Sequence, residues 1–199
     1  MNYPKGIKKE NSSNYIKFDN RGMGLESDIN STNQYYIDNG IAYIYKKPTP
    51  IQVTKVDYKS SNAIIKEAYF KEPSTTDYNG LYKGLYIDFE AKETTSKTSF
   101  PLSNIHKHQI EHIKHIILNG GIGFLIVRFT SYNKDYILLG KDLFDFLDNN
   151  NRKSIPLSYF KEKGYEIELS YSPRLDYLKI IDKIIGGNKN VKEKESSSS

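Results

Sequence analysis

Residues 86–92 read Tyr-Ile-Asp-Phe-Glu-Ala-Lys, a stretch in which polar and apolar side chains alternate. This alternation is typical of a β-strand, because successive side chains point to opposite faces of a sheet. One face of the predicted strand carries Tyr86, Asp88, Glu90 and Lys92. Two carboxylates and an ammonium on one face of a half-buried strand are costly unless they are paired or used. The stretch therefore predicts a strand with a candidate site on its polar face.

A third carboxylate, Asp77, precedes this strand in the turn-rich segment Ser-Thr-Thr-Asp-Tyr-Asn-Gly at residues 74–80. Gly80 and Gly84 permit a sharp reversal or a close backbone approach. Carboxylates bind hard cations, and a lysine on the same strand face can stabilise the charge that develops on a phosphate. An Asp followed by Glu-x-Lys thus outlines a metal-dependent nuclease site. Glu-x-Lys also occurs in ordinary surface strands as a salt bridge, so these residues alone leave both interpretations open.

The composition sets the class of protein. At 199 residues the chain suits one compact α/β domain. It has no cysteine, which excludes disulfides, thiolate metal sites and a cysteine nucleophile. There is no apolar stretch near the roughly 18 residues that span a bilayer, so we expect a cytoplasmic protein without membrane contact. A net charge of +5 permits an anionic partner such as nucleic acid but does not select one.

Apolar periodicity and turn residues divide the chain into elements. We expect helices at about residues 21–39, 105–118, 141–148 and 175–185, the second of them capped by Asn104. We expect strands at about residues 41–46, 51–58, 63–70, 84–92, 122–129, 136–139 and 165–169. Residues 1–19 are predicted to form a flexible basic arm, residues 20–186 a single domain, and residues 187–199 a disordered tail.

The segment at residues 46–72 has few apolar residues to bury and many lysines. This pattern favours an exposed basic hairpin, although lysines also protect the edges of ordinary sheets. The lysines of the segment are Lys46, Lys47, Lys55, Lys59, Lys66 and Lys71.

Several longer strings occur in a fixed order along the chain. They are Asn-Arg-Gly-Met-Gly-Leu-Glu at residues 20–26, Lys-Lys-Pro-Thr-Pro at 46–50, Lys-Glu-Ala-Tyr-Phe at 66–70, the segments at 74–80 and 87–94, and His-Gln-Ile-Glu-His at 108–112. Together they resemble the RecU family of bacterial Holliday junction resolvases over about residues 20–180. The resemblance implies a restriction-endonuclease-like α/β fold, a mixed sheet flanked by helices, with a projecting basic β-hairpin stalk. It also implies a Mg²⁺-dependent homodimer that resolves four-way DNA junctions by paired symmetric nicks in recombination and repair.

The resemblance also assigns roles to individual residues. It places the family's metal positions on Thr75, Asp77, Glu90 and Gln109, and the transition-state stabiliser on Lys92. These types suit the chemistry, since carboxylate and amide oxygens bind magnesium and an ammonium stabilises a phosphorane.

Two further carboxylates are candidate supporting residues. Glu26 matches a carboxylate that nucleases of this fold often bring towards the site, and is otherwise an ordinary residue of a helix surface. Asp88 shares the face of Glu90 and is expected to support the site indirectly or to form a salt bridge with Lys92.

The implied substrate and partners are branched DNA, a second copy of the chain and a recombinase. The stalk would enter the junction, and lysine contacts to phosphate would give affinity without base specificity. The candidate DNA-binding residues are Arg21, Lys46, Lys47, Lys55, Lys66 and Lys71. Two alternatives remain: a catalytically silent branched-DNA-binding protein, and a restriction-type or repair nuclease. The four histidines within residues 105–115 lack a zinc-hydrolase pattern and are expected on a polar helix face.

Overall fold

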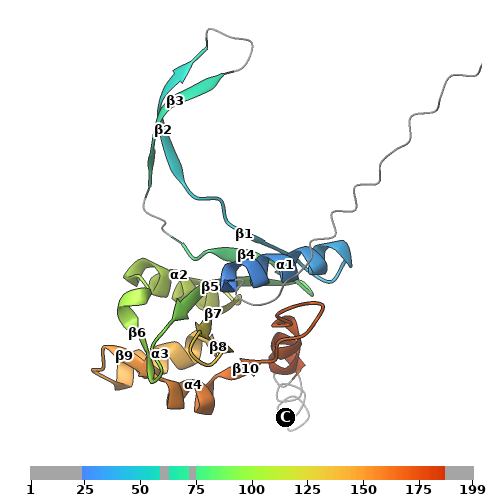
Figure 1. The fold of residues 1–199 in the computed structure, drawn as a ribbon, viewed down its shortest axis with the longest axis vertical. Coiled ribbons are helices and arrows are strands. Elements are labelled where there is room, and N and C mark those ends of the chain that lie inside the picture. Colours follow the sequence, from blue (N-terminus) through green and yellow to red (C-terminus); the bar gives the residue numbers. More distant parts are fainter. Residues whose placement is uncertain (1–23, 59–62, 72–74, 187–199) are drawn as a thin grey trace, which may run out of the picture.

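A six-stranded mixed sheet forms the centre of the computed structural model, with strand order β1-β4-β5-β7-β8-β10 (Figure 1). The parallel pair is β5 with β7, and the other neighbours are antiparallel. The strands are β1 (Tyr43–Lys46), β4 (Tyr78–Tyr82), β5 (Leu85–Thr94), β7 (Ile122–Phe129), β8 (Lys134–Leu139) and β10 (Tyr165–Ile167). The structure describes residues 24–58, 63–71 and 75–186, so the predicted arm at 1–19, Arg21 and the predicted tail at 187–199 lie outside it.

Helices flank this sheet on both faces. They are α1 (Leu25–Asp38), α2 (Lys107–Leu118), α3 (Gly140–Asn149) and α4 (Leu157–Lys163), with a 3₁₀ turn η1 (Leu102–Asn104) before α2. Residues 178–186 are also helical. Two short strands, β6 (Ser99–Pro101) and β9 (Ser154–Pro156), pair with each other outside the main sheet. The predicted fold class, a mixed α/β sheet flanked by helices, is confirmed.

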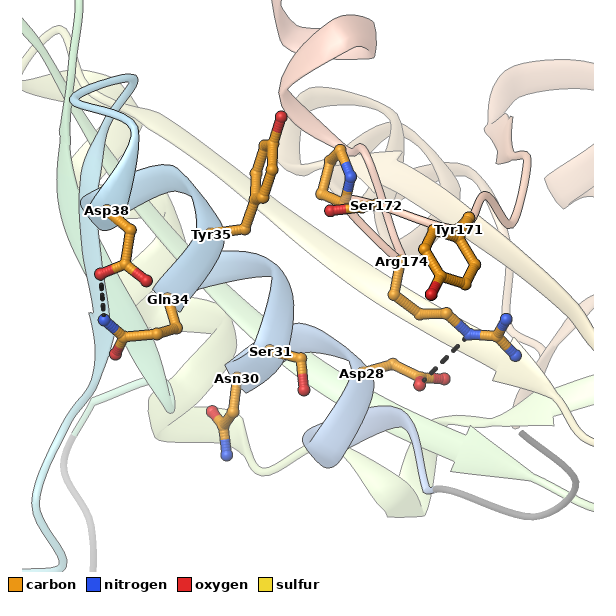
Figure 2. A pocket seen from close by; sticks show the side chains of 10 residues that line it. Asp28, Asn30, Ser31, Gln34, Tyr35, Asp38, Tyr171, Ser172 and Arg174 are labelled. Atoms are coloured by element: carbon orange, nitrogen blue, oxygen red, sulfur yellow. Dashed lines mark hydrogen bonds and ion pairs between the residues drawn. The ribbon is translucent and has the colours of Figure 1, made fainter. Parts of the chain in front are cut away.

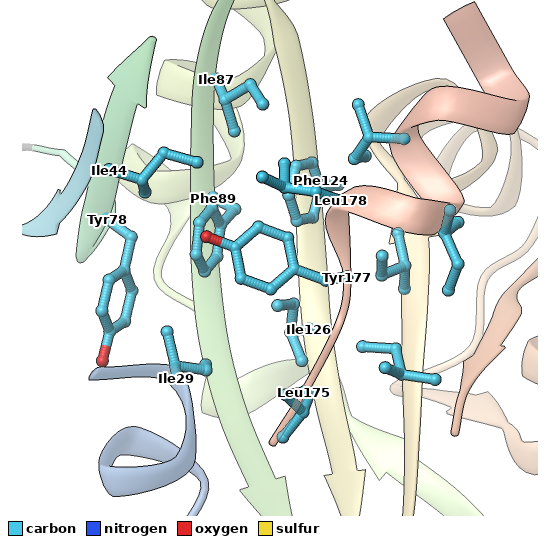
Figure 3. Close-up of a cluster of buried hydrophobic side chains, with 14 of the residues drawn as sticks. Ile29, Ile44, Tyr78, Ile87, Phe89, Phe124, Ile126, Leu175, Tyr177 and Leu178 are labelled. Atoms are coloured by element: carbon cyan, nitrogen blue, oxygen red, sulfur yellow. The ribbon is translucent and has the colours of Figure 1, made fainter. Parts of the chain in front are cut away.

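The two faces of the sheet bury different cores. On one face α1 and the segment from Leu175 onward cover a cluster in which Tyr78, Phe89 and Phe124 stack in sequence (Figure 3). On the other face α2, α3 and α4 cover apolar side chains of β7 and β8. β5 supplies no residue to this second apolar core, because its positions on that side are polar. A polar face in the middle of a covered sheet marks the place to look for a site.

The predicted hairpin stalk is present. It consists of β2 (Ile51–Asp57) and β3 (Ile64–Phe70), which pair with each other and project away from the main sheet (Figure 1). Every residue of β3 is exposed, and no residue of β2 is fully buried. The stalk therefore depends on its own cross-strand pairing and on its attachment to β1 and β4.

The observed elements correct several predictions. β4 lies in the segment predicted as turn-rich, and there Gly80 provides a close approach, since a Cβ would lie 2.1 Å from the Tyr43 carbonyl oxygen. The reversal falls at Lys83 and Gly84, which both have positive φ. Helix α2 is capped by His106 rather than Asn104, which belongs to η1. β6, β9 and α4 were not predicted, and the last helix begins at residue 178 rather than 175. No helix in the described ranges has the length and apolarity to span a bilayer.

Candidate active site

Strand β5 carries the candidate site into a covered position. Its parallel register with β7 sets Asp88 beside Gly123 and Glu90 beside Leu125. Both carboxylates are fully buried, because α2 packs over β5 and β7 on this side. The prediction of a half-buried strand is therefore wrong, and the polar face is more enclosed than the sequence indicates. Burial makes each charge there more costly unless it has a partner.

Asp77 and Glu90 meet at the start of β4. The backbone N–H of Asp77 donates to Glu90 Oε2 over 3.0 Å, and Lys92 Nζ lies 2.7 Å from Glu90 Oε1. Burial raises the pKa of Glu90 to about 7, with the Asp77 carboxylate adding to the shift and Lys92 opposing it. The two carboxylates are thus close enough to repel, and the Lys92 ammonium contacts Glu90.

This arrangement fits a hard divalent cation. Glu90 Oε1 is buried, and the charged partner recorded for it among the described residues is Lys92 Nζ at 2.7 Å. A buried carboxylate oxygen beside a second carboxylate is a suitable ligand for magnesium, which prefers oxygen donors. Within residues 24–58, 63–71 and 75–186, no three His, Asp or Glu side chains are placed together to hold a metal ion. Among the described residues, Asp77 and Glu90 are therefore the candidate carboxylate ligands, and Thr75 and Gln109 are the neutral ones.

The two neutral candidate ligands differ in their contacts. The Thr75 hydroxyl donates to the Thr76 carbonyl over 3.3 Å, two positions before Asp77. Gln109 is buried, but its side-chain oxygen accepts from the His106 backbone N–H over 2.9 Å and caps α2. In this structure Gln109 therefore serves the helix terminus, and Thr75 lines a hollow at the stalk base together with Asp77.

Asp88 has partners other than those expected. Its carboxylate lies 2.8 Å from Lys47 Nζ, accepts from the Thr76 hydroxyl, and lies 3.2 Å from His112 Nε2. The alternative of a salt bridge to Lys92 is wrong, because Lys92 pairs with Glu90. The sequence did not identify Thr76 or His112 as partners of Asp88. The only hint in the sequence was their position, since Thr76 precedes Asp77 and His112 ends the string at 108–112.

The remaining predicted residues lie around the base of the stalk. Glu26, in the first turn of α1, pairs with Lys46 at 2.6 Å and stays exposed, so it reaches the stalk base rather than Glu90. Lys47 points inward, with 19% of its side chain exposed, which corrects its expected place on an exposed hairpin. On the stalk Lys55 lies 3.7 Å from Glu67, and Lys66 lies 3.5 Å from Asp57. Lys71 is exposed at the end of β3.

Two of the hollows in the described part of the chain lie close to other predicted or conspicuous groups, and neither contains Asp77 or Glu90. His108, His112 and His115 line a shallow one on α2, in line with the predicted polar helix face. The other, of about 530 Å³, lies between α1 and the segment around Pro173 (Figure 2). It contains none of the predicted site residues. The hollow beside Pro173 is therefore not the candidate active site.

Comparison with known proteins gives a consistent result. The family described as "RecU: Recombination protein U" matches residues 20–183. A protein of Pediococcus pentosaceus named Holliday junction resolvase RecU is 59% identical over 169 residues, covering 83% of this chain and 84% of that protein. A Streptococcus thermophilus protein of the same name is 50% identical over 196 residues, covering 94% and 99%. A solved structure of Archaeoglobus fulgidus Hjc is titled a Holliday junction resolvase. It matches with a TM-score of 0.39 and 9% sequence identity, covering 67% of this chain and 90% of that one. This likeness is too low to bear on the site.

Proposed function

The chain belongs to the RecU family, and from that premise we propose that it is a metal-dependent endonuclease that resolves four-way DNA junctions. The observation that supports the chemistry is the fully buried Glu90, which accepts from the backbone of the half-buried Asp77 and has Lys92 beside it. The pair lies next to the base of a projecting hairpin, as a protein that reads the shape of a branch requires. We infer paired symmetric nicks from family membership.

Asp77 and Glu90, with Thr75, would hold a magnesium ion, which supplies charge neutralisation at the phosphate and a more acidic water. Gln109 would join them through its amide if the α2 cap opened, or through a water. The raised pKa of Glu90 indicates that the metal-free site favours a proton on this carboxyl. A bound cation would replace that proton, so metal affinity should rise with pH near neutrality.

Lys92 is placed to stabilise the charge that develops on the phosphate. Its Nζ contacts Glu90 Oε1 at 2.7 Å, and a quarter of its side chain is exposed, so the ammonium reaches both the carboxylate pair and the surface. An ammonium held in a partly water-excluded site stabilises an anion more than it would in water.

The assembly and cellular setting follow from the same proposal. A twofold homodimer would set two such sites on opposing strands, and a recombinase is the expected partner at recombination intermediates. We take residues 20–186 as one nuclease domain, with residues 46–72 as its stalk. Since the proposed substrate is chromosomal DNA of bacteria, the protein would act in the cytoplasm.

The test is cleavage of a synthetic four-way junction and a linear duplex of the same sequence, with and without Mg²⁺. We expect the wild type to nick the junction in the presence of Mg²⁺ only, and Glu90→Ala to bind the junction without cutting it. Glu162→Gln, an exposed carboxylate on α4, is the matched control and should cut normally.

Each other outcome contradicts the proposal in a recognisable way. Equal cutting by wild type and Glu90→Ala would place the chemistry elsewhere. Binding without cutting by a dimeric wild type would favour a silent branched-DNA-binding protein. Cutting of the duplex at least as well as the junction would favour a restriction-type or repair nuclease.

A further inference from the structure

One buried carboxylate joins both ends of the stalk to the strand of the candidate active site. Asp88 on β5 is fully buried, and its Oδ2 accepts from Lys47 Nζ over 2.8 Å, while its other oxygen accepts from the Thr76 hydroxyl. Lys47 follows β1, where the chain leaves the sheet for the stalk, and Thr76 precedes β4, where it returns. Asp88 therefore contacts both legs of the stalk, which we define as residues 47–50 and 75–77.

The legs are also joined to the carboxylate pair through the backbone. The Lys47 N–H donates to the Asp77 carbonyl over 2.7 Å, and the Asp77 N–H donates to Glu90 Oε2 over 3.0 Å. This continues the β1–β4 pairing, which ends at Lys46 opposite Tyr78. Lys47 thus contacts Asp88 with its side chain and Asp77 with its backbone, so the leg cannot turn without disturbing both.

Two further donors hold Asp88 itself in place. The Tyr86 hydroxyl donates to Asp88 Oδ2 over 3.1 Å, and His112 Nε2 of α2 lies 3.2 Å from the same oxygen. Tyr86 in turn accepts from the Asn79 side-chain amide over 2.9 Å. Groups from the two legs, β5 and α2 therefore converge on one carboxylate, and β4 is linked to it through Tyr86.

Such convergence has a specific mechanical consequence. A buried carboxylate is costly unless its lone pairs are satisfied, so the Asp88 contacts must be kept together or lost together. Apart from β2–β3 pairing, the stalk buries little side-chain surface that could fix its angle. The contacts at its base are therefore what sets its direction relative to Asp77 and Glu90.

We propose that Asp88 is a positioning residue that fixes the direction of the stalk relative to the cutting site, and so sets which phosphodiester is cut. The inference rests on the proposed junction-cutting function and extends it. Asp88 neither contacts the phosphate nor holds the metal; it acts through Lys47 and Thr76. Losing it should loosen the stalk base while leaving Asp77, Glu90 and Lys92 present.

The test uses Asp88→Asn, Lys47→Met and the double variant on a four-way junction labelled on each strand. Asparagine keeps the shape of Asp88 but removes its charge. We expect junction affinity within a few fold of wild type and a fall in kcat of about 10- to 100-fold, the effect of a misplacement of about 1 Å. We also expect nicks spread over phosphodiesters next to the normal one. The double variant should be no worse than the worse single variant, because both remove the same connection.

Lys83→Met is the matched control, since it breaks an exposed ion pair with Asp182, 2.6 Å long, elsewhere on the sheet. It should leave the rate and the position of the nicks unchanged. If Asp88→Asn fails to fold, Lys47→Met alone decides, because its side chain is partly exposed and outside β5.

Three results would overturn the proposal. Unchanged kcat with unchanged nick positions would show that the stalk base needs no such connection. A reduced kcat with unchanged positions would assign Asp88 a purely local role beside Glu90. Additive losses in the double variant would show that Lys47 and Asp88 act separately.

Hydrogen exchange separates this inference from the proposed function. In DNA-free protein, the amides of Lys47 and Asp77 should exchange at least about tenfold faster in Asp88→Asn than in wild type, while those of β7 keep their rate. If the wild type cuts no junction, the proposed function fails and this measurement decides whether Asp88 holds the legs. Unchanged exchange at both amides would then reject the connection.

Discussion

Two clusters of charged side chains centre on the adjacent strands β5 and β7, and their charges are balanced to different degrees. The first, the structural cluster, comprises Asp28, Arg128, Asp135 and Arg174. Arg128 donates to both oxygens of Asp135 over 2.7 and 2.9 Å and lies 2.7 Å from Asp28. Arg174 adds a pair with Asp28 at 3.5 Å (Figure 2). The second, the site cluster, comprises Asp77, Glu90 and Lys92.

The difference between the clusters shows which one is built for stability. In the structural cluster two guanidinium groups face two carboxylates. Burial would lower the pKa of Arg128, but the hydrogen bonds that it donates to Asp135 and Asp28 outweigh burial and raise it, while burial also raises the pKa of Asp135. In the site cluster one ammonium faces two carboxylates, and the pKa of Glu90 is raised to about 7. Removing one member of a balanced buried cluster leaves an unpaired buried charge and destabilises the fold, whereas an unbalanced cluster is stabilised by an added cation.

The largest expected effect is the loss of stability on breaking the balanced cluster. Arg128→Met leaves Asp28 and Asp135 buried beside each other with little compensation. Removing one partner of a buried ion pair costs about 3–5 kcal/mol. Urea unfolding should show that loss as a lower midpoint with an unchanged slope. A loss below about 1 kcal/mol would mean that the cluster is not the stabilising one.

The next effect is on the rate of cutting rather than on stability. Lys92→Met removes the ammonium of the site cluster, and we expect a fall in single-turnover cleavage of about 10²–10³-fold. Stability should change little, because Glu90 can take up a proton when its partner is lost. Cleavage kinetics test the predicted loss of rate, and urea unfolding of the same preparation tests the predicted lack of change in stability. A stability loss as large as that of Arg128→Met would remove the distinction between the clusters.

A pH-dependent gain in stability should follow the removal of the Glu90 charge. The pKa of Glu90 rises from 4.5 to about 7 on folding, so the folded protein binds the proton more tightly and loses stability as pH rises through this window. Glu90→Gln lacks that loss and should be more stable than wild type at pH 8, by at most about 3 kcal/mol at 1.36 kcal/mol per pKa unit. Near pH 4 the two proteins should match.

Magnesium provides the control for this experiment. At saturating Mg²⁺ the wild type should regain stability, because a ligand that binds only the folded state stabilises it, while Glu90→Gln should respond much less. Thermal unfolding at pH 5 and 8, with and without Mg²⁺, gives all the comparisons. If the wild type were more stable than Glu90→Gln at pH 8 without metal, the negative charge of Glu90 would not destabilise the folded protein.

The sequence predicted the parts of this comparison that depend on local pattern. Alternation placed Glu90 and Lys92 on one strand face, the turn-rich lead-in made Asp77 a third candidate, and the family resemblance assigned it a metal position. The inward course of Lys47 was not predictable, because its contact with Asp88 depends on the pairing of β1 with β4. β4 itself was missed since Asn79 and Gly80 have low strand propensity, which sheet pairing on both sides overrides.

The contacts of the structural cluster could not be predicted from the sequence either. Arg128 lies within a run read only as a buried apolar strand, and no local signal named its partners. Asp135 lies directly opposite it on β8, but Asp28 comes from α1, far away in sequence. Periodicity identifies which elements are buried, whereas the balance of charge between elements is set by tertiary packing.

The smallest expected effects lie on the stalk, where charges are exposed and pairing is loose. The separations of 3.7 Å in Lys55–Glu67 and 3.5 Å in Lys66–Asp57 exceed hydrogen-bond length, and exposed pairs contribute little to stability. Lys55→Met should therefore shift the melting temperature by less than about 4 °C.

If Lys55 contacts a phosphate, the slope of log affinity against log salt should fall in magnitude by about 0.9. Glu67→Gln changes the other partner of the same ion pair. It leaves Lys55 without its carboxylate neighbour and should strengthen junction binding at low salt. Equal salt slopes in all three proteins would mean that this part of the stalk reads the junction without its lysine, and that exposed charge on the stalk serves solubility instead.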